Sequence, residues 1–148
     1  NFFPLKLIHH FKLDTALGKY EGALNYLQES LKIRQEIGDR SGEGNTLQNI
    51  GAVYRSLGKY EEALNYLQES LKVSKKIGNR SGEGAYFNEI GLVYYNLGKY
   101  EEAVNYYQKS LKIEREIGNC SGEGANLQNI GAVYGNLGRE NASNFFDK

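Results

Sequence analysis

The sequence is poor in residues that interrupt helices or cross-link chains. Of its 148 residues only Pro4 is proline and only Cys120 is cysteine. Proline removes a backbone donor and clashes with the preceding helical turn, so its scarcity leaves long stretches free to form helix. A single cysteine excludes an internal disulfide framework and favours a reducing compartment. We therefore expect a helical protein that works in the cytoplasm.

The sequence also has no excess of charge and no long hydrophobic run. Eighteen basic residues balance eighteen acidic ones, whereas binding to nucleic acid or to an anionic membrane surface requires a basic footprint. No apolar run approaches the ~20 residues that span a bilayer. The apolar segment 1–13 lacks the basic head and the small-residue cleavage site of a signal peptide. These absences predict neither a nucleic-acid partner nor a membrane association.

Glycine, by contrast, is abundant, although each glycine inside a helix costs about 1 kcal/mol. Sixteen of the eighteen glycines recur every 40 residues, in series that begin at Gly18, Gly38, Gly42, Gly44 and Gly51. A strict spacing of this kind indicates that glycine ends helices or allows close packing at fixed positions, and it excludes a low-complexity segment.

The whole chain follows the same period. Residues 41–80 and 81–120 are identical at 24 of 40 positions, and self-similarity of this kind is typical of stacked-repeat proteins. We predict one solenoid over residues 1–148. It consists of a degenerate first repeat at 1–40, full repeats at 41–80 and 81–120, and a truncated last repeat at 121–148.

Each full repeat contains two amphipathic helical patterns, predicted over residues 41–57 and 60–77 in the second repeat. Gly58 and Gly78 suit the left-handed residue that ends a helix. Asn79 and Ser81 are both suitable caps for the next helix, and the sequence does not choose between them. With the end repeats included, the pattern predicts seven main helices and no strand. Leu67 and Tyr54 should lie in the core, and Gly51 should face Ala63 of the second helix.

These residues resemble the tetratricopeptide repeat (TPR) family. The matching pattern in the second repeat comprises Leu47, Ile50, Gly51, Tyr54, Gly58, Tyr60, Ala63 and Leu67. The unit of 40 residues departs from the common 34, and Ser70 and Ser110 replace a small apolar alanine. The repeat is similar to the long-helix variant of kinesin light chain and Pins-type adaptors, and to repeats of large bacterial multidomain proteins. The resemblance implies an all-α, right-handed superhelical solenoid of about three and a half repeats, with the first helix of each repeat lining a concave groove that binds a peptide.

The expected groove is rich in side-chain amides, which donate and accept hydrogen bonds and so match the backbone of an extended peptide. In the middle repeat Glu89 interrupts the series of asparagines that the resemblance implies at this position. Arg55 is the only basic residue in the expected groove, which disfavours a clamp for a C-terminal carboxylate. The predicted peptide-binding residues are Gln48, Asn49, Ala52, Arg55, Asn88, Glu89, Leu92, Tyr95, Gln128 and Asn129.

No catalytic or metal site is predicted, and no cofactor. His9 and His10 are adjacent, so on a helix they diverge by about 100° and cannot share a metal ion. Cys120 lies in a predicted turn without a neighbouring histidine, so it is interpreted as a free thiol. The Ser-Gly-Glu-Gly segments that begin at residues 41, 81 and 121 lack the Gly-Lys-Ser ending of a phosphate loop, and we interpret them as helix starts.

The two ends of the chain lack the polar cap that terminal repeats of a solenoid normally carry. Phe11 and Asp14 stand where the second repeat has Gly51 and Tyr54, and the final residues resemble a second helix that stops midway. We therefore expect exposed apolar ends, and either association into a homo-oligomer or continuation into a longer array.

The leading functional interpretation is a protein–protein interaction scaffold that binds a peptide or protein surface. Two alternatives remain open: a peptide-sensing regulatory arm of a larger multidomain protein, and a self-associating structural repeat segment, of natural or engineered origin. An enzyme is disfavoured because the sequence contains no nucleophile–base pair and no set of metal ligands.

Overall fold

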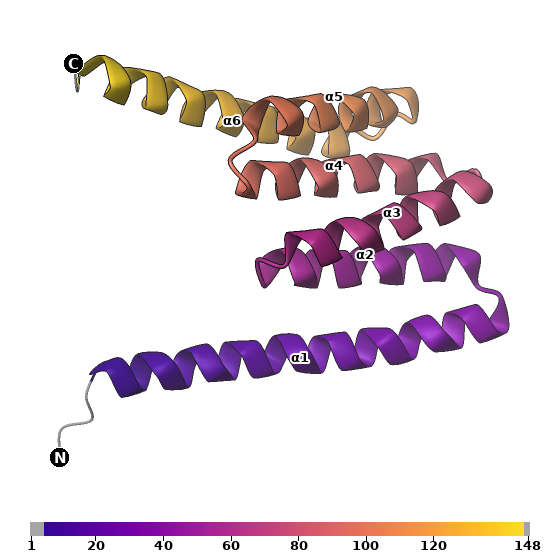
Figure 1. Ribbon diagram of the computed structural model, residues 1–148. Coiled ribbons are helices and arrows are strands. Elements are labelled where there is room, and N and C mark those ends of the chain that lie inside the picture. Colours follow the sequence, from indigo (N-terminus) through magenta and orange to yellow (C-terminus); the bar gives the residue numbers. More distant parts are fainter. Residues whose placement is uncertain (1–4, 147–148) are drawn as a thin grey trace.

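The computed structural model describes residues 5–146, apart from the side chains of residues 5–14, 142, 145 and 146. This part of the chain forms six α-helices and no strand: α1 (Leu5–Ile37), α2 (Arg40–Ser56), α3 (Tyr60–Lys76), α4 (Arg80–Asn96), α5 (Tyr100–Glu116) and α6 (Cys120–Phe146). The helices stack in chain order from α1 at one end to α5 and α6 at the other (Figure 1). The prediction of an all-α, TPR-like solenoid is confirmed.

The turns are built from a left-handed glycine followed by a capping residue. Five glycines, at positions 38, 58, 78, 98 and 118, have φ between +68° and +74°, a conformation that glycine adopts without steric cost. After Gly78 the side chain of Asn79 accepts a 3.0 Å hydrogen bond from the Gly82 amide. The cap of α4 is therefore Asn79 and not Ser81.

The core runs along the stack, both between the two helices of a repeat and between neighbouring repeats. Leu67 is fully buried, as predicted, whereas Tyr54 is only half-buried and stacks on Tyr66 with a ring-centroid distance of 5.4 Å. A Cβ atom at Gly51 would lie 2.8 Å from Cγ of Leu67 and 3.3 Å from the carbonyl oxygen of Ala63. This glycine therefore lets α2 and α3 approach closely, as its recurrence indicates.

The prediction of seven helices is wrong for the described residues, because Gly18 and Gly138 do not end helices. Both lie inside the long helices α1 and α6, whereas their counterparts Gly58 and Gly98 reverse the chain. At the inner positions the second helix packs back on the first and stabilises the reversal. In α1 and α6 no second helix packs back in this way among the described residues, and the backbone keeps its helical hydrogen bonds through both glycines.

Two further expectations concern the chain ends. Cys120 is the first residue of α6 and is exposed, so it begins a helix and does not lie in a turn. The apolar side chains predicted to be exposed at the two ends include Phe11, Phe145 and Phe146, and these lie outside the described side chains.

Candidate interaction face

The predicted binding residues lie on the first helices of successive repeats, α2, α4 and α6. The helices contribute equivalent positions, because the 40-residue period repeats their helical phase, except that α6 contributes Asn136 in place of the residue equivalent to Arg55 and Tyr95. We call this surface the three-helix face. It comprises Gln48, Asn49, Ala52 and Arg55 of α2, Asn88, Glu89, Leu92 and Tyr95 of α4, and Gln128, Asn129, Ala132 and Asn136 of α6.

Side chains bridge neighbouring helices across this face. Arg55 of α2 forms an ion pair with Glu89 of α4, with Nε 3.3 Å from the carboxylate. The Asn129 amide of α6 donates a 2.9 Å hydrogen bond to the side-chain oxygen of Asn88. The Asn136 amide donates to the Tyr95 hydroxyl at 2.6 Å. The structure thus brings the predicted residues of three separate repeats into one connected surface.

Glu89, which interrupts the asparagine series, has a structural partner in this arrangement. Its side chain and that of Arg55 are about four-fifths buried, at 18% and 23% exposure. A pair of this kind holds the only basic residue of the face against the neighbouring helix. The charge of Arg55 is therefore balanced within the protein.

The two largest predicted contacts, Leu92 and Tyr95, are half-buried. Both pack against the core cluster that contains Ala103, Tyr107 and Val133. Burial, with a smaller contribution from the nearby Tyr95, raises the pKa of Tyr107 to about 12. The hydroxyl of Tyr107 consequently stays protonated beneath this face throughout the neutral range.

Three carboxamides on the face remain unengaged. Within the described part of the chain, the side chains of Gln48, Asn49 and Gln128 take part in no hydrogen bond. Asn49 and Gln128 are exposed and Gln48 is half-buried. These amides retain their donors and acceptors for a ligand.

Ala52 completes the predicted set, and Ala132 is its equivalent on α6. They occupy the position of Leu92 in their repeats, so the middle of the face carries one large apolar side chain between two small ones. Asn136 was not among the predicted binding residues, although its bridge to Tyr95 is the shortest of the three on this face. Its partner lies 41 residues earlier, the same separation as in the Asn88–Asn129 pair, and both contacts depend on the distance between α4 and α6, which the sequence does not give.

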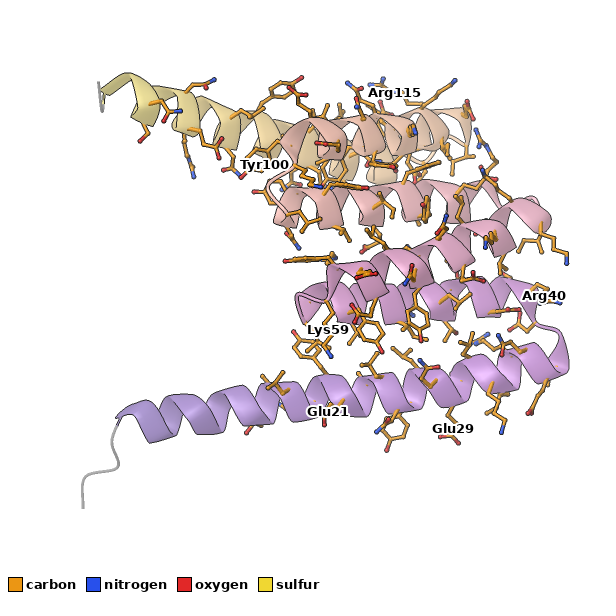
Figure 2. The ribbon with its side chains drawn as sticks, in the orientation of Figure 1. Glu21, Glu29, Arg40, Lys59, Tyr100 and Arg115 are labelled. Atoms are coloured by element: carbon orange, nitrogen blue, oxygen red, sulfur yellow. The ribbon has the colours of Figure 1, made fainter. Side chains whose placement is uncertain are left out.

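The Ser-Gly-Glu-Gly segments begin helices, as expected. They stabilise the turns along one side of the stack, where the second helix of a repeat leads into the next repeat. Glu43 and Glu83 are buried and paired with Arg40 and Arg80, and Arg80 also reaches Glu116 on α5. Figure 2 shows Arg40 and Arg115 on this side of the stack and Lys59 and Tyr100 on the opposite side. These acidic residues therefore have partners within the protein itself.

The described residues contain neither a cluster of metal ligands nor a helix suited to cross a membrane. No three histidine, cysteine, aspartate or glutamate side chains gather as they would to hold a metal ion. None of the described helices combines the length and the hydropathy needed to cross a membrane.

The stacked helix pairs define a helical-repeat protein. The sequence matches the model of the tetratricopeptide repeat over residues 13–76 and 83–144. The chain belongs to the tetratricopeptide repeat family, whose repeats are non-catalytic and generally mediate protein–protein interaction. No curated protein matches the chain.

Solved structures support the same assignment. A signal transduction ATPase with numerous domains (STAND) that has a tetratricopeptide repeat sensor, from Pyrococcus horikoshii, is 30% identical with a TM-score of 0.71, over 78% of this chain and 18% of that chain. BtubC (BKLC) from P. vanneervenii is 22% identical with a TM-score of 0.70, over 82% of this chain and 51% of that one.

Aspartyl phosphate phosphatase F from Bacillus subtilis is 21% identical with a TM-score of 0.65, over 85% of this chain and 36% of that one. The likeness to these last two structures concerns the fold alone. In all three comparisons the chain spans only part of the other protein, between about a fifth and a half of its length.

Proposed function

We propose that the chain is a protein–protein interaction scaffold of the cytoplasm that binds a peptide or protein surface across the three-helix face, in the concave groove of the solenoid. The observation that carries the proposal is the set of unengaged carboxamides, Gln48, Asn49 and Gln128, on the same face as a half-buried Leu92. Amides match the polar backbone of an extended peptide, and the leucine offers one apolar contact for a ligand side chain.

The neighbouring bridges support this proposal, because they hold the face in one arrangement. Arg55 is fixed by Glu89, and Asn88 is fixed by Asn129. A preorganised surface loses less conformational entropy when it binds than a flexible one does. The balanced Arg55–Glu89 pair favours a ligand without strong net charge.

A peptide display selection against the immobilised chain tests the proposal. The selected peptide is then measured against a variant in which Gln48, Asn49 and Gln128 are all replaced by alanine. Each lost hydrogen bond is worth about 0.5–1.5 kcal/mol, so the affinity should fall about tenfold or more. Unchanged affinity would place the peptide on another surface.

The chain offers a matched control for this variant. Asn65, Gln68 and Gln108 are exposed carboxamides on the second helices α3 and α5, and they too lack side-chain hydrogen bonds. Replacing these three by alanine removes the same chemistry from a different surface. The affinity for the selected peptide should then remain unchanged.

A second candidate is a sensor arm that binds a peptide and controls an effector elsewhere in a larger protein. It is favoured by the likeness to the repeat sensor of the STAND ATPase, at 30% identity and 18% coverage of that protein. The candidate requires an effector domain in the full-length protein, so activity of the full-length protein that responds to the selected peptide would support it. A response that survives alanine at Gln48, Asn49 and Gln128 would contradict it.

A further inference from the structure

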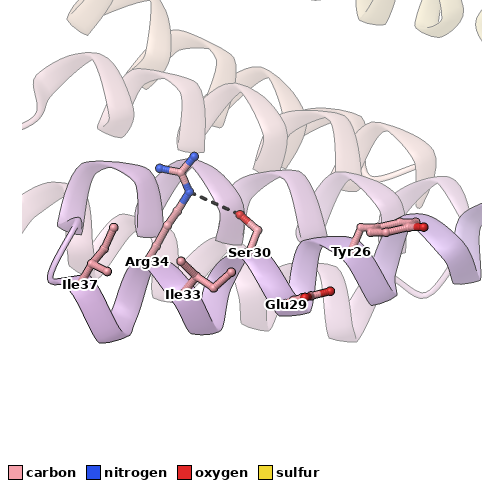
Figure 3. Close-up of a pocket in the computed structure, with 6 residues that line it drawn as sticks. All are labelled: Tyr26, Glu29, Ser30, Ile33, Arg34 and Ile37. Atoms are coloured by element: carbon pink, nitrogen blue, oxygen red, sulfur yellow. Dashed lines mark hydrogen bonds between the residues drawn. The ribbon is translucent and has the colours of Figure 1, made fainter.

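The outer face of α1 lacks the covering helix that the inner repeats have. Tyr26, Ile33 and Ile37 are 78%, 49% and 70% exposed. Together with Glu29, Ser30 and Arg34 they line a shallow hollow along one side of the helix (Figure 3). In Figure 2, Glu29 on this side points away from the rest of the stack.

The counterparts of Tyr26, Ser30 and Ile33 in the inner repeats are partly or fully covered by the first helix of their own repeat. Tyr66, which corresponds to Tyr26, stacks on Tyr54, and Tyr106 stacks on Tyr94 at 5.2 Å. Ser70 corresponds to Ser30 and donates a 2.8 Å hydrogen bond to the Gly44 carbonyl. The vacant face of α1 is thus one half of an interface that occurs twice elsewhere in the chain.

The other half of the same interface is vacant on α6. Leu127 and Tyr134 are 47% and 59% exposed, whereas their counterparts Leu47 and Tyr54 are buried and half-buried. A Cβ atom at Gly124 or Gly131 would meet nothing within 4 Å. The equivalent glycines of α2, Gly44 and Gly51, are in contact with side chains of α3.

We propose that a second copy of the chain covers these faces, with α6 of one molecule packing antiparallel on α1 of the next and completing a repeat between them. By equivalence with the α2–α3 pair, Tyr134 stacks on Tyr26 of the second molecule. The Ser30 hydroxyl of that molecule donates to the Gly124 carbonyl, and its Leu27 fills the space at Gly131.

The N-terminal segment of the same chain is a poorer occupant of the α1 face. It would place Phe11 at the position of Gly51 and Asp14 at the position of Tyr54. Even a single carbon atom at Gly51 would collide with Leu67, so a phenylalanine at that position cannot reproduce the close approach. Segment 5–17 also continues straight into α1 without folding back.

The long end helices suit pairing between two molecules. Within one chain the paired helices need a turn, which Gly58 and Gly98 provide. Two separate molecules need no turn, so α1 and α6 run straight through Gly18 and Gly138. Both helices project on the same side of the stack (Figure 1). An antiparallel pair of α1 and α6 is therefore longer than a helix pair within the chain, such as α2 and α3.

Contact between two different faces is heterologous, so each added molecule leaves one free α1 face and one free α6 face. The chain should therefore form a concentration-dependent series of oligomers. Sedimentation velocity from micromolar to millimolar concentration, in reductant so that exposed Cys120 forms no disulfide, should show masses above that of a dimer. A strictly monomeric chain would overturn the proposal.

A mixing experiment identifies the two faces. Ile33→Glu blocks the α1 face and Tyr134→Glu blocks the α6 face, and both side chains are exposed, so neither change should unfold the chain. Each variant alone should sediment as a monomer. An equimolar mixture should give a heterodimer and nothing larger, because only one competent pair of faces remains.

Other outcomes have distinct meanings. A dimer of Tyr134→Glu alone would show that α1 pairs with α1, and a dimer of Ile33→Glu alone would show that α6 pairs with α6; either result contradicts the head-to-tail arrangement. Gln108→Glu on the exposed side of α5 adds the same charge away from both faces. This control should assemble like the original chain, and circular dichroism should show equal helix content in all variants.

Discussion

The hydroxyl of Ser110 on α5 donates a 2.8 Å hydrogen bond to the backbone carbonyl of Gly84 on α4. Ser110 is fully buried, and Gly84 is buried beside it. The bond requires close approach of the two helices, which glycine allows because it has no side chain. It explains why serine stands where the family usually has alanine.

This hydrogen bond can be tested by comparison with an end position. Ser110→Ala should lower the free energy of unfolding by about 1–3 kcal/mol, because the buried hydrogen bonds to the Gly84 carbonyl and from the Asn126 amide are both lost. Ser30→Ala changes the equivalent residue of α1, which is half-buried and faces no partner helix, and should change stability by less than about 0.5 kcal/mol. Urea denaturation of both variants at low concentration gives the comparison; equal losses would contradict it.

Two equivalent glycines should respond oppositely to alanine. At Gly91 the added carbon would lie 2.5 Å from the ring of Tyr107, whereas at Gly131 it would meet nothing within 4 Å. Gly91→Ala should destabilise the fold by about 1–3 kcal/mol through overpacking. Gly131→Ala should stabilise the monomer by about 0.5–1 kcal/mol, because alanine favours helix. Thermal unfolding of dilute samples measures both, and the same sign for both would refute the assigned packing.

Leu67 marks the centre of the core between α2, α3 and α4. Because it is fully buried, Leu67→Ala should cost about 2–5 kcal/mol, as large-to-small core substitutions do. The exposed neighbour Gln68 serves as a control, and its replacement by alanine should change stability by less than about 0.5 kcal/mol. Equilibrium denaturation would count against the packing if Leu67→Ala behaved like the control.

Asp39, which caps the start of α2, should make the stability of the protein sensitive to acid. The hydrogen bond from the Gly42 amide, together with the Arg34 guanidinium, lowers the pKa of Asp39 below its usual 3.8. Its stabilising effect is therefore fully present above pH 3.8 and is lost as the pH falls through the lowered value.

Asn79 and Asn119 cap the equivalent helices without titrating. Asp39→Asn should therefore retain the cap. The difference in stability between the variant and the original chain should shift in favour of the variant as the pH falls below about 3.8. Denaturation at a series of pH values measures this difference, and a constant difference from pH 6 to 2 would contradict the prediction.

The central contacts of the three-helix face provide a functional test. Replacing Asn88, Leu92 and Tyr95 together by alanine should abolish binding of a selected peptide. Because Leu92 and Tyr95 also pack against the core, the variant should be less stable but remain helical. Calorimetry measures the binding and circular dichroism the fold; undiminished binding by a folded variant would place the ligand elsewhere.

The sequence by itself determined the repeating part of the fold. Gly58 and Gly78 mark helix ends because only glycine enters the left-handed region freely, and Gly51 marks a close helix contact because it has no side chain. The 40-residue period also determined which residues share a face, since equal helical phase puts Gln48, Asn88 and Gln128 on equivalent surfaces. Local rules of this kind act wherever a neighbouring repeat supplies the same environment.

Tertiary structure alone decided what happens where that environment changes. Gly18 and Gly58 occupy the same position in the repeat, yet only Gly58 reverses the chain. A reversal interrupts helical hydrogen bonds and persists only where packing against a second helix compensates for them. The bridges from Arg55 to Glu89 and from Asn136 to Tyr95 likewise depend on distances between helices, which no local pattern contains.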